Sequence, residues 1–252
     1  MAPFLMFVLE MQFEGVRAKA LLNDIQVCER VGGKSGMSQI NLNLWIMEGR
    51  NKIQVFAAAE GGRATQRLAL KLLAGPYGEL PPALAEKQWD AAAKPLGASG
   101  YTLVWEHEFT PECAFGRWAW QDAPVASLGA EERAGITALV QEVQTALEKG
   151  DVKRLGEFFK LKNAETARAL GMEEAEMAEG MNGMFEEFAH ARKRKVEPLD
   201  AGELVMTPQA GGRLIQVTAA QGGAPVKASG EDSELELEMA VSQVGGRWTI
   251  VR

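Results

Sequence analysis

The sequence contains few residues of the kinds that make covalent cross-links and metal sites. Its 252 residues include two cysteines and two histidines. The cysteines, Cys28 and Cys113, form no CxxC pair and have no metal-ligand spacing. Two thiols so far apart in sequence fit a reducing compartment, although a single bridge between them stays open. The sequence therefore predicts neither a metal site nor a bound cofactor.

Long hydrophobic runs and an excess of basic residues are also missing. No run approaches the ~20 apolar residues that a membrane-spanning helix needs. The opening residues, MAPFLMFVLEM, lack the basic start and the small-residue cleavage site of a signal peptide. A formal net charge of −7 argues against nucleic-acid binding but permits a basic protein partner. These absences predict a cytoplasmic protein that binds neither membranes nor nucleic acids.

The clearest pattern that is present lies in the last twenty residues, 233–252. Leu235, Leu237 and Met239 alternate with glutamates, and a period of two places them on one face of a strand. Gly245-Gly246 suits a two-residue hairpin turn, which needs positive φ angles. The predicted register then pairs residue 244 with 247, 243 with 248 and 241 with 250. Cross-strand partners share a face, so the tryptophan at 248 and the isoleucine at 250 join the apolar layer.

The first half reads as short strands separated by turn residues. We expect strands over residues 4–13, 20–28, 40–46, 52–59 and 101–109, with 113–120 pairing with the last of them. Residues 67–73 fit either a strand or one helical turn, and residues 84–93 fit a short helix. Two segments, ALLND and NLNLWIMEGRNKIQV, resemble the galactose-binding-like β-sandwiches that are appended to many glycosidases. The resemblance implies a β-sandwich domain over residues 1–122, in which Gly49 and Asn51 form a turn rather than a sugar site.

The second half opens with helical patterns. Ile136, Leu139, Val140, Val143 and Leu147 make an apolar stripe, and Gly150 ends that helix. Asp151 is placed to cap a second helix and Asn163 a third, which ends at Gly171. A fourth helix carries an apolar stripe of Met177, Met181, Met184, Phe185 and Phe188. Four strands follow, at residues 196–207, 213–220, 234–243 and 247–252.

Two segments of this half, TALEKGDVKRLGEFF and GGRWTIVR, resemble the NTF2-like, cystatin-like α+β superfamily. The matching positions are Gly150-Asp151 between two helices and Gly246, Trp248 and Ile250 in the last strand. The resemblance implies helices packed on a four-stranded antiparallel sheet over residues 130–252, after a linker at 122–129. The predicted fold class is therefore α+β. The same scaffold supports isomerases, hydrolases, ligand binders and interaction domains, so it does not define a function.

Three short motifs resemble functional sites, but for each of them we favour a structural role. GGKS at residues 32–35 resembles part of a phosphate loop, but Cys28 stands where the motif needs glycine and a strand follows where it needs a helix. His107 lies on a strand face with Tyr101 and Trp105, without a partner for catalysis or metal binding. His190 precedes the basic run 192–195 at the end of a helix, where cations are stabilised by the helix dipole. A phosphate or acidic-partner site is the alternative for that run.

The expected helix-facing side of the sheet offers no acid or base. Its inward positions are apolar, with Gln243 as the one polar group, whereas an enzyme of this scaffold needs a proton-transferring residue in the same place. We therefore predict that the protein is not an enzyme and has no catalytic residues.

An acidic tract on the fourth helix is the remaining candidate site. It comprises Glu173, Glu174, Glu176, Glu179, Glu186 and Glu187, with no basic residue between Met172 and His190. At ~100° per residue, the glutamates at 176, 179, 186 and 187 lie opposite the methionines. The tract is either an ordinary solvated helix face or a negative patch that docks on a basic surface.

The resulting hypothesis is a non-enzymatic protein-binding module. The chain looks like a cytoplasmic immunity protein that blocks a cognate toxin, such as a nuclease of a type VI-like secretion system, whose basic cleft suits an acidic blocker. One alternative is an NTF2-like small-molecule-binding protein or enzyme. Another is a carbohydrate-binding accessory protein that uses Trp118 and Trp120 as a platform, although core packing is also a common use of tryptophan.

Overall fold

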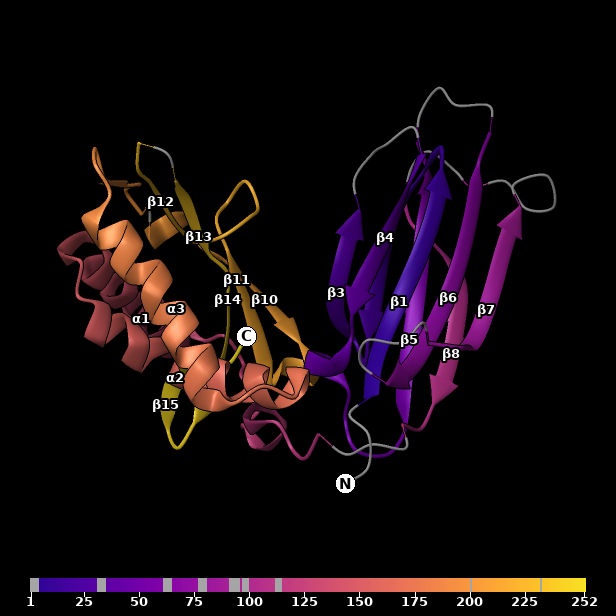
Figure 1. Cartoon of the computed structure of the whole chain (residues 1–252), viewed down its shortest axis with the longest axis horizontal. Helices are drawn as coiled ribbons and strands as arrows, with labels where there is room; N and C mark the ends of the chain where they lie inside the picture. The colour runs from indigo at the N-terminus through magenta and orange to yellow at the C-terminus, as the bar shows by residue number, and fades with distance from the viewer. Residues whose placement is uncertain are drawn as a thin grey trace. The chain divides into compact units, whose positions relative to one another are not determined.

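The structure combines helices and antiparallel sheets in two compact units. It is a computed structural model of the chain and describes residues 5–30, 35–60, 65–76, 81–90, 96, 100–111, 115–199, 201–231 and 233–252. The units are Met1–Arg117 and Trp118–Arg252. The described residues form three α-helices and four antiparallel sheets, so the predicted α+β class is confirmed (Figure 1). The division between the units precedes the predicted linker at 122–129.

The first unit contains two four-stranded antiparallel sheets. One sheet has the order β4-β1-β6-β7, with β4 Ser35–Asn41, β1 Leu5–Glu14, β6 Arg67–Pro76 and β7 Ala83–Asp90. The other has the order β3-β2-β5-β8, with β3 Ile25–Arg30, β2 Val16–Leu22, β5 Asn51–Ala59 and β8 Thr102–Phe109. Every second residue of β1 from Phe7 to Phe13 is buried, as the alternating pattern requires. Phe7 stacks on Phe109 of the other sheet with ring centroids 6.0 Å apart.

The predicted single strand over residues 20–28 is wrong, because the chain turns in its middle. Asn23 and Asp24 have φ angles of 54° and 62°, the left-handed region that asparagine and aspartate tolerate better than most residues. The Asn23 side chain holds the turn by accepting from the Lys52 amide at 3.0 Å. The segment is therefore a hairpin of β2 and β3.

The predicted strand over residues 40–46 ends early, at Asn41. A short 3-10 helix, η1 Asn43–Trp45, replaces its second half. The buried Asn43 side chain accepts from the Phe7 amide at 2.8 Å and donates to the Leu5 carbonyl at 3.0 Å. A side chain that satisfies neighbouring backbone groups competes with strand pairing, which the alternation of apolar residues does not reveal.

The turn predicted at residues 48–51 is confirmed. Gly49 has a φ angle of 83°, and the buried Asn51 side chain accepts from the Met47 amide and donates to its carbonyl, both at 2.8 Å. These bonds make Asn51 a structural residue of the turn.

Two later segments are strands. Residues 84–90 of the predicted helix are part of a strand, because β7 pairs with β6 and brings Trp89 opposite the buried Leu68. Residues 91–93 lie outside the described residues. Residues 67–73 belong to β6, so the strand is the correct one of the two predicted alternatives. Of the strand expected at 113–120, residues 113 and 114 lie outside the described residues. The rest is irregular up to a short 3-10 helix, η2 Ala119–Asp122.

The second unit begins with three helices: α1 Ala130–Lys149, α2 Val152–Leu170 and α3 Glu174–His190. Figure 1 shows them grouped against one side of the strands. The predicted stripe of α1 is confirmed, with Ile136, Val140, Val143 and Leu147 buried. Gly150 ends α1 with a φ angle of 68°, and Asp151 caps α2 by accepting from the Arg154 amide at 3.0 Å. No described helix is long and apolar enough to cross a membrane.

The prediction that Asn163 starts a third helix is wrong. It lies inside the continuous helix α2 and is buried, with an exposed fraction of 3%. The residues around it are good helix formers, so nothing in the backbone requires a break there. The second and third predicted helices are therefore one helix.

The strands of the second unit form two sheets rather than the single four-stranded sheet that was predicted. The larger sheet has the order β10-β11-β14-β15, with β10 Val205–Gln209, β11 Leu214–Thr218, β14 Met239–Val244 and β15 Arg247–Ile250. The smaller has the order β13-β12-β9, with β13 Glu234–Leu237, β12 Val226–Ser229 and β9 Lys195–Val196. The predicted strand at 234–243 is divided at Glu238 between the two sheets. Leu235, Leu237 and Met239 nevertheless all lie in the same buried core.

The predicted hairpin is confirmed in its register. Val241 pairs with Ile250, Gln243 with Trp248 and Val244 with Arg247. Gly245 and Gly246 have φ angles of 57° and 77°. Val241 and Ile250 of this hairpin lie in the same hydrophobic cluster as buried residues of the three helices.

Lys162 of α2 lies next to the division between β13 and β14 and gives a pH prediction. Its Nζ donates to the Glu238 carbonyl at 3.0 Å, and burial lowers its pKa from 10.5, while Glu238 opposes the shift. A lysine with a lowered folded-state pKa destabilises the fold below that pKa, and the effect disappears as the pH rises to 10.5. We expect wild type to gain unfolding free energy relative to Lys162→Met over this alkaline range. Urea unfolding at pH 7 to 10.5 measures the difference, with Lys160→Met at an exposed position of α2 as control.

Candidate functional site

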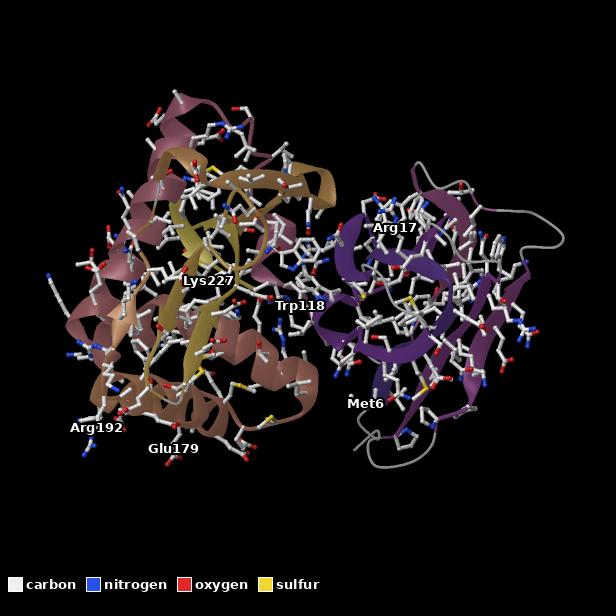
Figure 2. All side chains as sticks on the ribbon, turned by 90° about the horizontal axis from the view of Figure 1, so that it is seen from above. Met6, Arg17, Trp118, Glu179, Arg192 and Lys227 are labelled. Atoms are coloured by element: carbon white, nitrogen blue, oxygen red, sulfur yellow. The ribbon has the colours of Figure 1, made fainter. Side chains whose placement is uncertain are left out.

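The six glutamates of the predicted partner-binding tract lie on α3 or at its N-cap. All six are exposed: Glu173, Glu174, Glu176, Glu179, Glu186 and Glu187. Among the described residues, none of them takes part in an ion pair. Figure 2 shows Glu179 pointing away from the body of the second unit. At ~100° per residue, Glu176, Glu179, Glu186 and Glu187 lie opposite the buried Phe185 and Phe188, and we call these four residues the acidic face of α3. Glu173 and Glu174 lie at the start of the helix. The structure therefore places the six predicted residues along one helix, exposed and without an ion-pair partner among the residues it describes.

The opposite side of α3 is fixed to the second unit by two phenylalanines. Phe185 and Phe188 are buried, and the Phe185 ring lies 5.6 Å from that of Phe159 on α2. The predicted methionine stripe is only partly confirmed, because Met184 is exposed at 36% while Met181 packs on the core. Packed aromatic rings hold the helix in place, so the acidic face has a defined direction.

The basic run after α3 donates hydrogen bonds to carbonyl groups at the C-terminal ends of two helices. Arg194 donates to the carbonyl of Ala189 at 3.0 Å and to that of Glu148, in the last turn of α1, at 2.8 Å. Lys193 pairs with Glu231 at 2.7 Å. His190 Nδ1 lies 2.7 Å from the Glu186 carbonyl. These contacts support the interpretation that the basic run stabilises the end of a helix. Among the described residues, no contact supports the alternative of a phosphate site.

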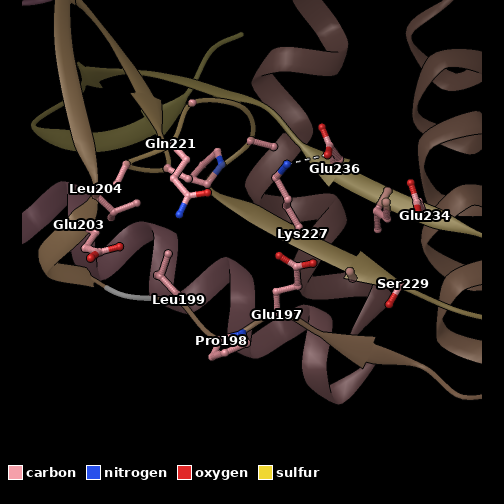
Figure 3. A pocket seen from close by; sticks show the side chains of 17 residues that line it. Glu197, Pro198, Leu199, Glu203, Leu204, Gln221, Lys227, Ser229, Glu234 and Glu236 are labelled. Atoms are coloured by element: carbon pink, nitrogen blue, oxygen red, sulfur yellow. Dashed lines mark hydrogen bonds and ion pairs between the residues drawn. The ribbon is translucent and has the colours of Figure 1, made fainter.

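An acidic groove in the second unit was not foreseen. It has a volume of about 440 Å³ and is lined on its polar side by Glu197, Glu203, Glu234, Glu236 and Lys227. Figure 3 shows Glu203 near the apolar Leu199 and Leu204 at one end of the groove and Glu234 and Glu236 toward the other. Lys227 Nζ lies 2.7 Å from Glu236, and this hydrogen bond raises the lysine pKa. The lining residues come from segments up to 39 residues apart (197 and 236). The sequence pattern placed only Glu234 and Glu236 on the outer face of a strand and gave no sign that the other residues join them.

A buried ion pair in the second unit was also missed. Arg252 and Glu165 have exposed fractions of 6% and 5%, and their Nη1 and Oε2 atoms lie 2.5 Å apart. Glu165 also accepts from the Ala119 amide at 2.6 Å. Burial lowers the pKa of Arg252, and the charge of Glu165 opposes that shift. The pair joins α2, η2 and the residues after β15, which indicates a structural role.

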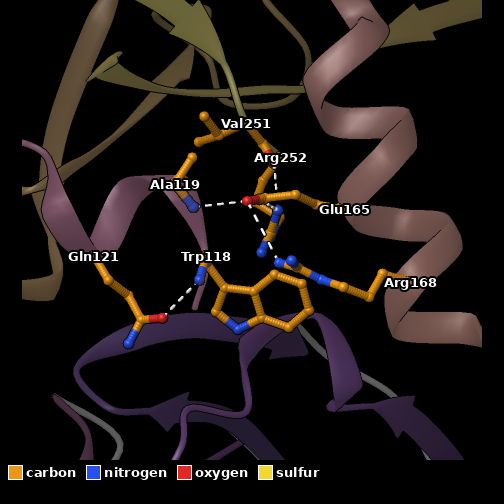
Figure 4. A network of polar contacts seen from close by, with 7 residues as sticks. All are labelled: Trp118, Ala119, Gln121, Glu165, Arg168, Val251 and Arg252. Atoms are coloured by element: carbon orange, nitrogen blue, oxygen red, sulfur yellow. Dashed lines mark hydrogen bonds and ion pairs between the residues drawn. The ribbon is translucent and has the colours of Figure 1, made fainter. Parts of the chain in front are cut away.

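Trp118 completes this network. The guanidinium carbons of Arg168 and Arg252 lie 4.4 and 4.7 Å from the centre of its ring (Figure 4). Trp118 and Trp120 have exposed fractions of 0% and 2%. The predicted alternative of an exposed tryptophan platform for carbohydrate is therefore wrong, because both rings are buried.

The other candidate residues lie in structural positions. The His107 ring is 5.9 Å from that of Trp105 and 6.5 Å from that of Phe109, in a stack along β8. Residues 32–34 of GGKS and Cys113 lie outside the described residues, whereas Ser35 begins a strand, not the helix of a phosphate loop. Within the described part of the chain, no three His, Cys, Asp or Glu side chains gather as metal ligands do.

Comparison with known proteins adds no relative. No protein-family model, curated protein or solved structure matches the chain.

Proposed function

We propose that this chain is a non-enzymatic protein-binding module that holds a basic protein partner on the acidic face of α3. More specifically, we propose a cytoplasmic immunity protein that blocks a cognate toxin, such as a nuclease of a type VI-like secretion system. The observation that carries the proposal is the set of six exposed glutamates on one well-packed helix, none of which has an ion-pair partner in the part of the chain that the structure describes. A concentrated negative surface accelerates encounter with a positive one and disfavours acidic partners.

The proposed architecture is a β-sandwich followed by an NTF2-like domain. The contact of Phe7 with Phe109 between the two sheets of the first unit supports the sandwich. The helices and the hairpin of residues Val241 and Ile250 around one apolar core support the second domain.

The interior of the second unit supports binding rather than catalysis. Apolar side chains of the helices and the sheets, such as Ile136, Phe159 and Val241, pack into one buried cluster, a lining that suits packing more than proton transfer. The buried charges that the structure does show, Glu165 and Arg252, are engaged with each other and with backbone groups.

The acidic groove favours a second candidate function, the binding of a small cationic ligand. Its glutamates outnumber its one lysine, and apolar side chains line the same space. The experiment below separates this groove from the acidic face of α3.

Two matched variants test the proposal. Glu176, Glu179 and Glu187 are changed to glutamine in one, and Glu197, Glu203 and Glu234 of the groove in the other, so that each loses three charges. The tagged proteins are used to capture partners from the native host at low salt. We expect a basic protein to be retained in stoichiometric amount by wild type and the groove variant. Its affinity for the α3 variant should be about tenfold weaker, because exposed ion pairs contribute about 0.2–1 kcal/mol each.

The affinities are then measured with the purified partner by titration calorimetry. Equal binding by the α3 variant, or the recovery of no stoichiometric partner, would contradict the proposal. Loss of binding only in the groove variant would indicate that the partner binds in the groove.

A further inference from the structure

The edge strands of the described sheets differ in how they are protected against pairing with another chain. An edge strand presents unpaired backbone N–H and C=O groups, and natural proteins protect it with charge, proline, a β-bulge or short length. The register shifts, as at a bulge, where β3, β7 and β8 pair with their neighbours. Pro208 lies in β10, and β9, β13 and β15 are short and carry charged residues. Among the described edges, β4 is the exception.

The edge strand β4 is long, regular and uncharged. Its residues, SGMSQIN, include neither proline nor a charged side chain. Its register with β1 runs without a shift from Ser35 to Asn41. Gly36, Met37 and Gln39 are exposed, Met37 with an exposed fraction of 58%. The strand therefore presents a continuous open edge that has none of the usual protection.

The ladder shows which backbone groups of β4 point away from β1. Directly after the strand, the Leu42 amide donates to the Phe7 carbonyl at 2.9 Å. Because hydrogen-bonded and non-hydrogen-bonded pairs alternate along an antiparallel ladder, the even-numbered residues of β4 bond to β1. Met37 and Gln39 direct their backbone N–H and C=O groups outward, on the side of β4 where the described sheet ends.

We propose that β4 pairs antiparallel with β4 of a second copy of the chain, about a two-fold axis at Ser38. In this register Met37 of each copy faces Gln39 of the other, and the outward backbone groups of both residues form hydrogen bonds across the axis. The sheet β4-β1-β6-β7 then continues from one copy into the next. The inference goes beyond the proposed function, since it concerns the first unit and needs no basic partner.

The side chains of β4 select a second copy as the occupant. In the proposed register the serines at the axis face each other, and Gly36 faces Ile40 of the second copy. A Cβ atom at Gly36 would lie 2.8 Å from the Phe13 ring, so this ring lies beside the glycine. An apolar side chain opposite covers the glycine and the ring edge. No like charges meet across the axis, whereas a basic segment would find no carboxylate on β4.

Sedimentation equilibrium of the full chain tests the pairing. We expect wild type to form a dimer as its concentration is raised. Met37→Lys/Gln39→Lys places lysine opposite lysine in the proposed register and should weaken the dimer about tenfold or more. Leu84→Lys/Gln88→Lys is the matched control, because it adds the same charge at exposed positions of β7, the other edge of the same sheet. It should associate as wild type does.

Hydrogen exchange of the wild-type amides gives a second readout that needs no variant. The outward amides of Met37 and Gln39 should exchange rapidly in dilute protein and more slowly where the dimer forms. This measurement decides the question if the lysine variant of β4 does not fold.

Each contrary result overturns the β4 pairing. These results are a wild type that stays monomeric, a lysine variant of β4 that associates as well as wild type, and outward amides that exchange equally at all concentrations. Open-ended assemblies would also overturn it, because a two-fold pair closes after two copies. Since no basic partner takes part, failure here leaves the proposed function intact, and loss of the proposed function leaves the dimer intact.

Discussion

Arg252→Met is expected to lower the free energy of unfolding by about 3–5 kcal/mol, the usual result of removing one member of a buried ion pair. The substitution leaves Glu165 with an exposed fraction of 5% and without the guanidinium 2.5 Å from its Oε2. It also removes one of the two cations that lie over the Trp118 ring. Urea unfolding of the full chain measures the change.

Two further variants show whether the uncompensated charge is the cause. Glu165→Met/Arg252→Met removes both charges and should be less destabilised than Arg252→Met, because apolar groups of similar volume often replace a buried pair without loss. Arg168→Met, whose side chain is 43% exposed and 3.7 Å from Glu165, should change stability by less than about 1 kcal/mol. A loss below about 1 kcal/mol in Arg252→Met would show that the pair is not needed for folding.

Phe185→Ala is expected to destabilise the protein by about 3–5 kcal/mol, the range for removing a buried phenylalanine side chain. The ring is 1% exposed and packs against Phe159, so its removal leaves a cavity between α2 and α3. Because Phe185 anchors the helix that carries the acidic face, hydrogen exchange of the α3 amides should also become faster.

The neighbouring Met184→Ala is the matched control for this prediction. Its side chain is 36% exposed, and we expect a change of less than about 1 kcal/mol. Equal losses in the two variants would mean that α3 is not held by the Phe185 contact, and the acidic face would then have no fixed orientation.

Local patterns predicted the parts of the fold that local chemistry determines. The alternation up to Val241 and the pair Gly245-Gly246 defined the last hairpin and its register, because turn geometry and strand period act over a few residues. The capping of α2 by Asp151 and the exposure of the six glutamates followed from similarly short-range rules.

The errors occurred where distant contacts override local preference. The helix-forming residues before Trp89 became a strand because β6 offered an edge and a buried position opposite Leu68. Asn43 ended a strand by bonding to residues 36 and 38 positions earlier in the chain. Turns at residues with φ angles near 60°, such as Asn23 and Asp24, leave no break in the apolar pattern.

The candidate sites show the same division. The acidic face of α3 is contiguous in sequence and was predicted from spacing alone. Glu165 and Arg252 are 87 residues apart, and the groove joins Glu197 to Glu236 through a sheet whose pairing the sequence did not reveal. No periodic pattern links such residues, so only the folded chain brings them together.

Carboxylate footprinting of the complex with the captured partner tests the central claim most directly. Exposed glutamates are labelled with carbodiimide and an amine, with and without the partner, and quantified by mass spectrometry. We predict that Glu176, Glu179 and Glu187 lose labelling in the complex while Glu197, Glu203 and Glu234 keep theirs. Unchanged labelling of the α3 glutamates in a complex that has formed would contradict the claim that this face is the binding surface.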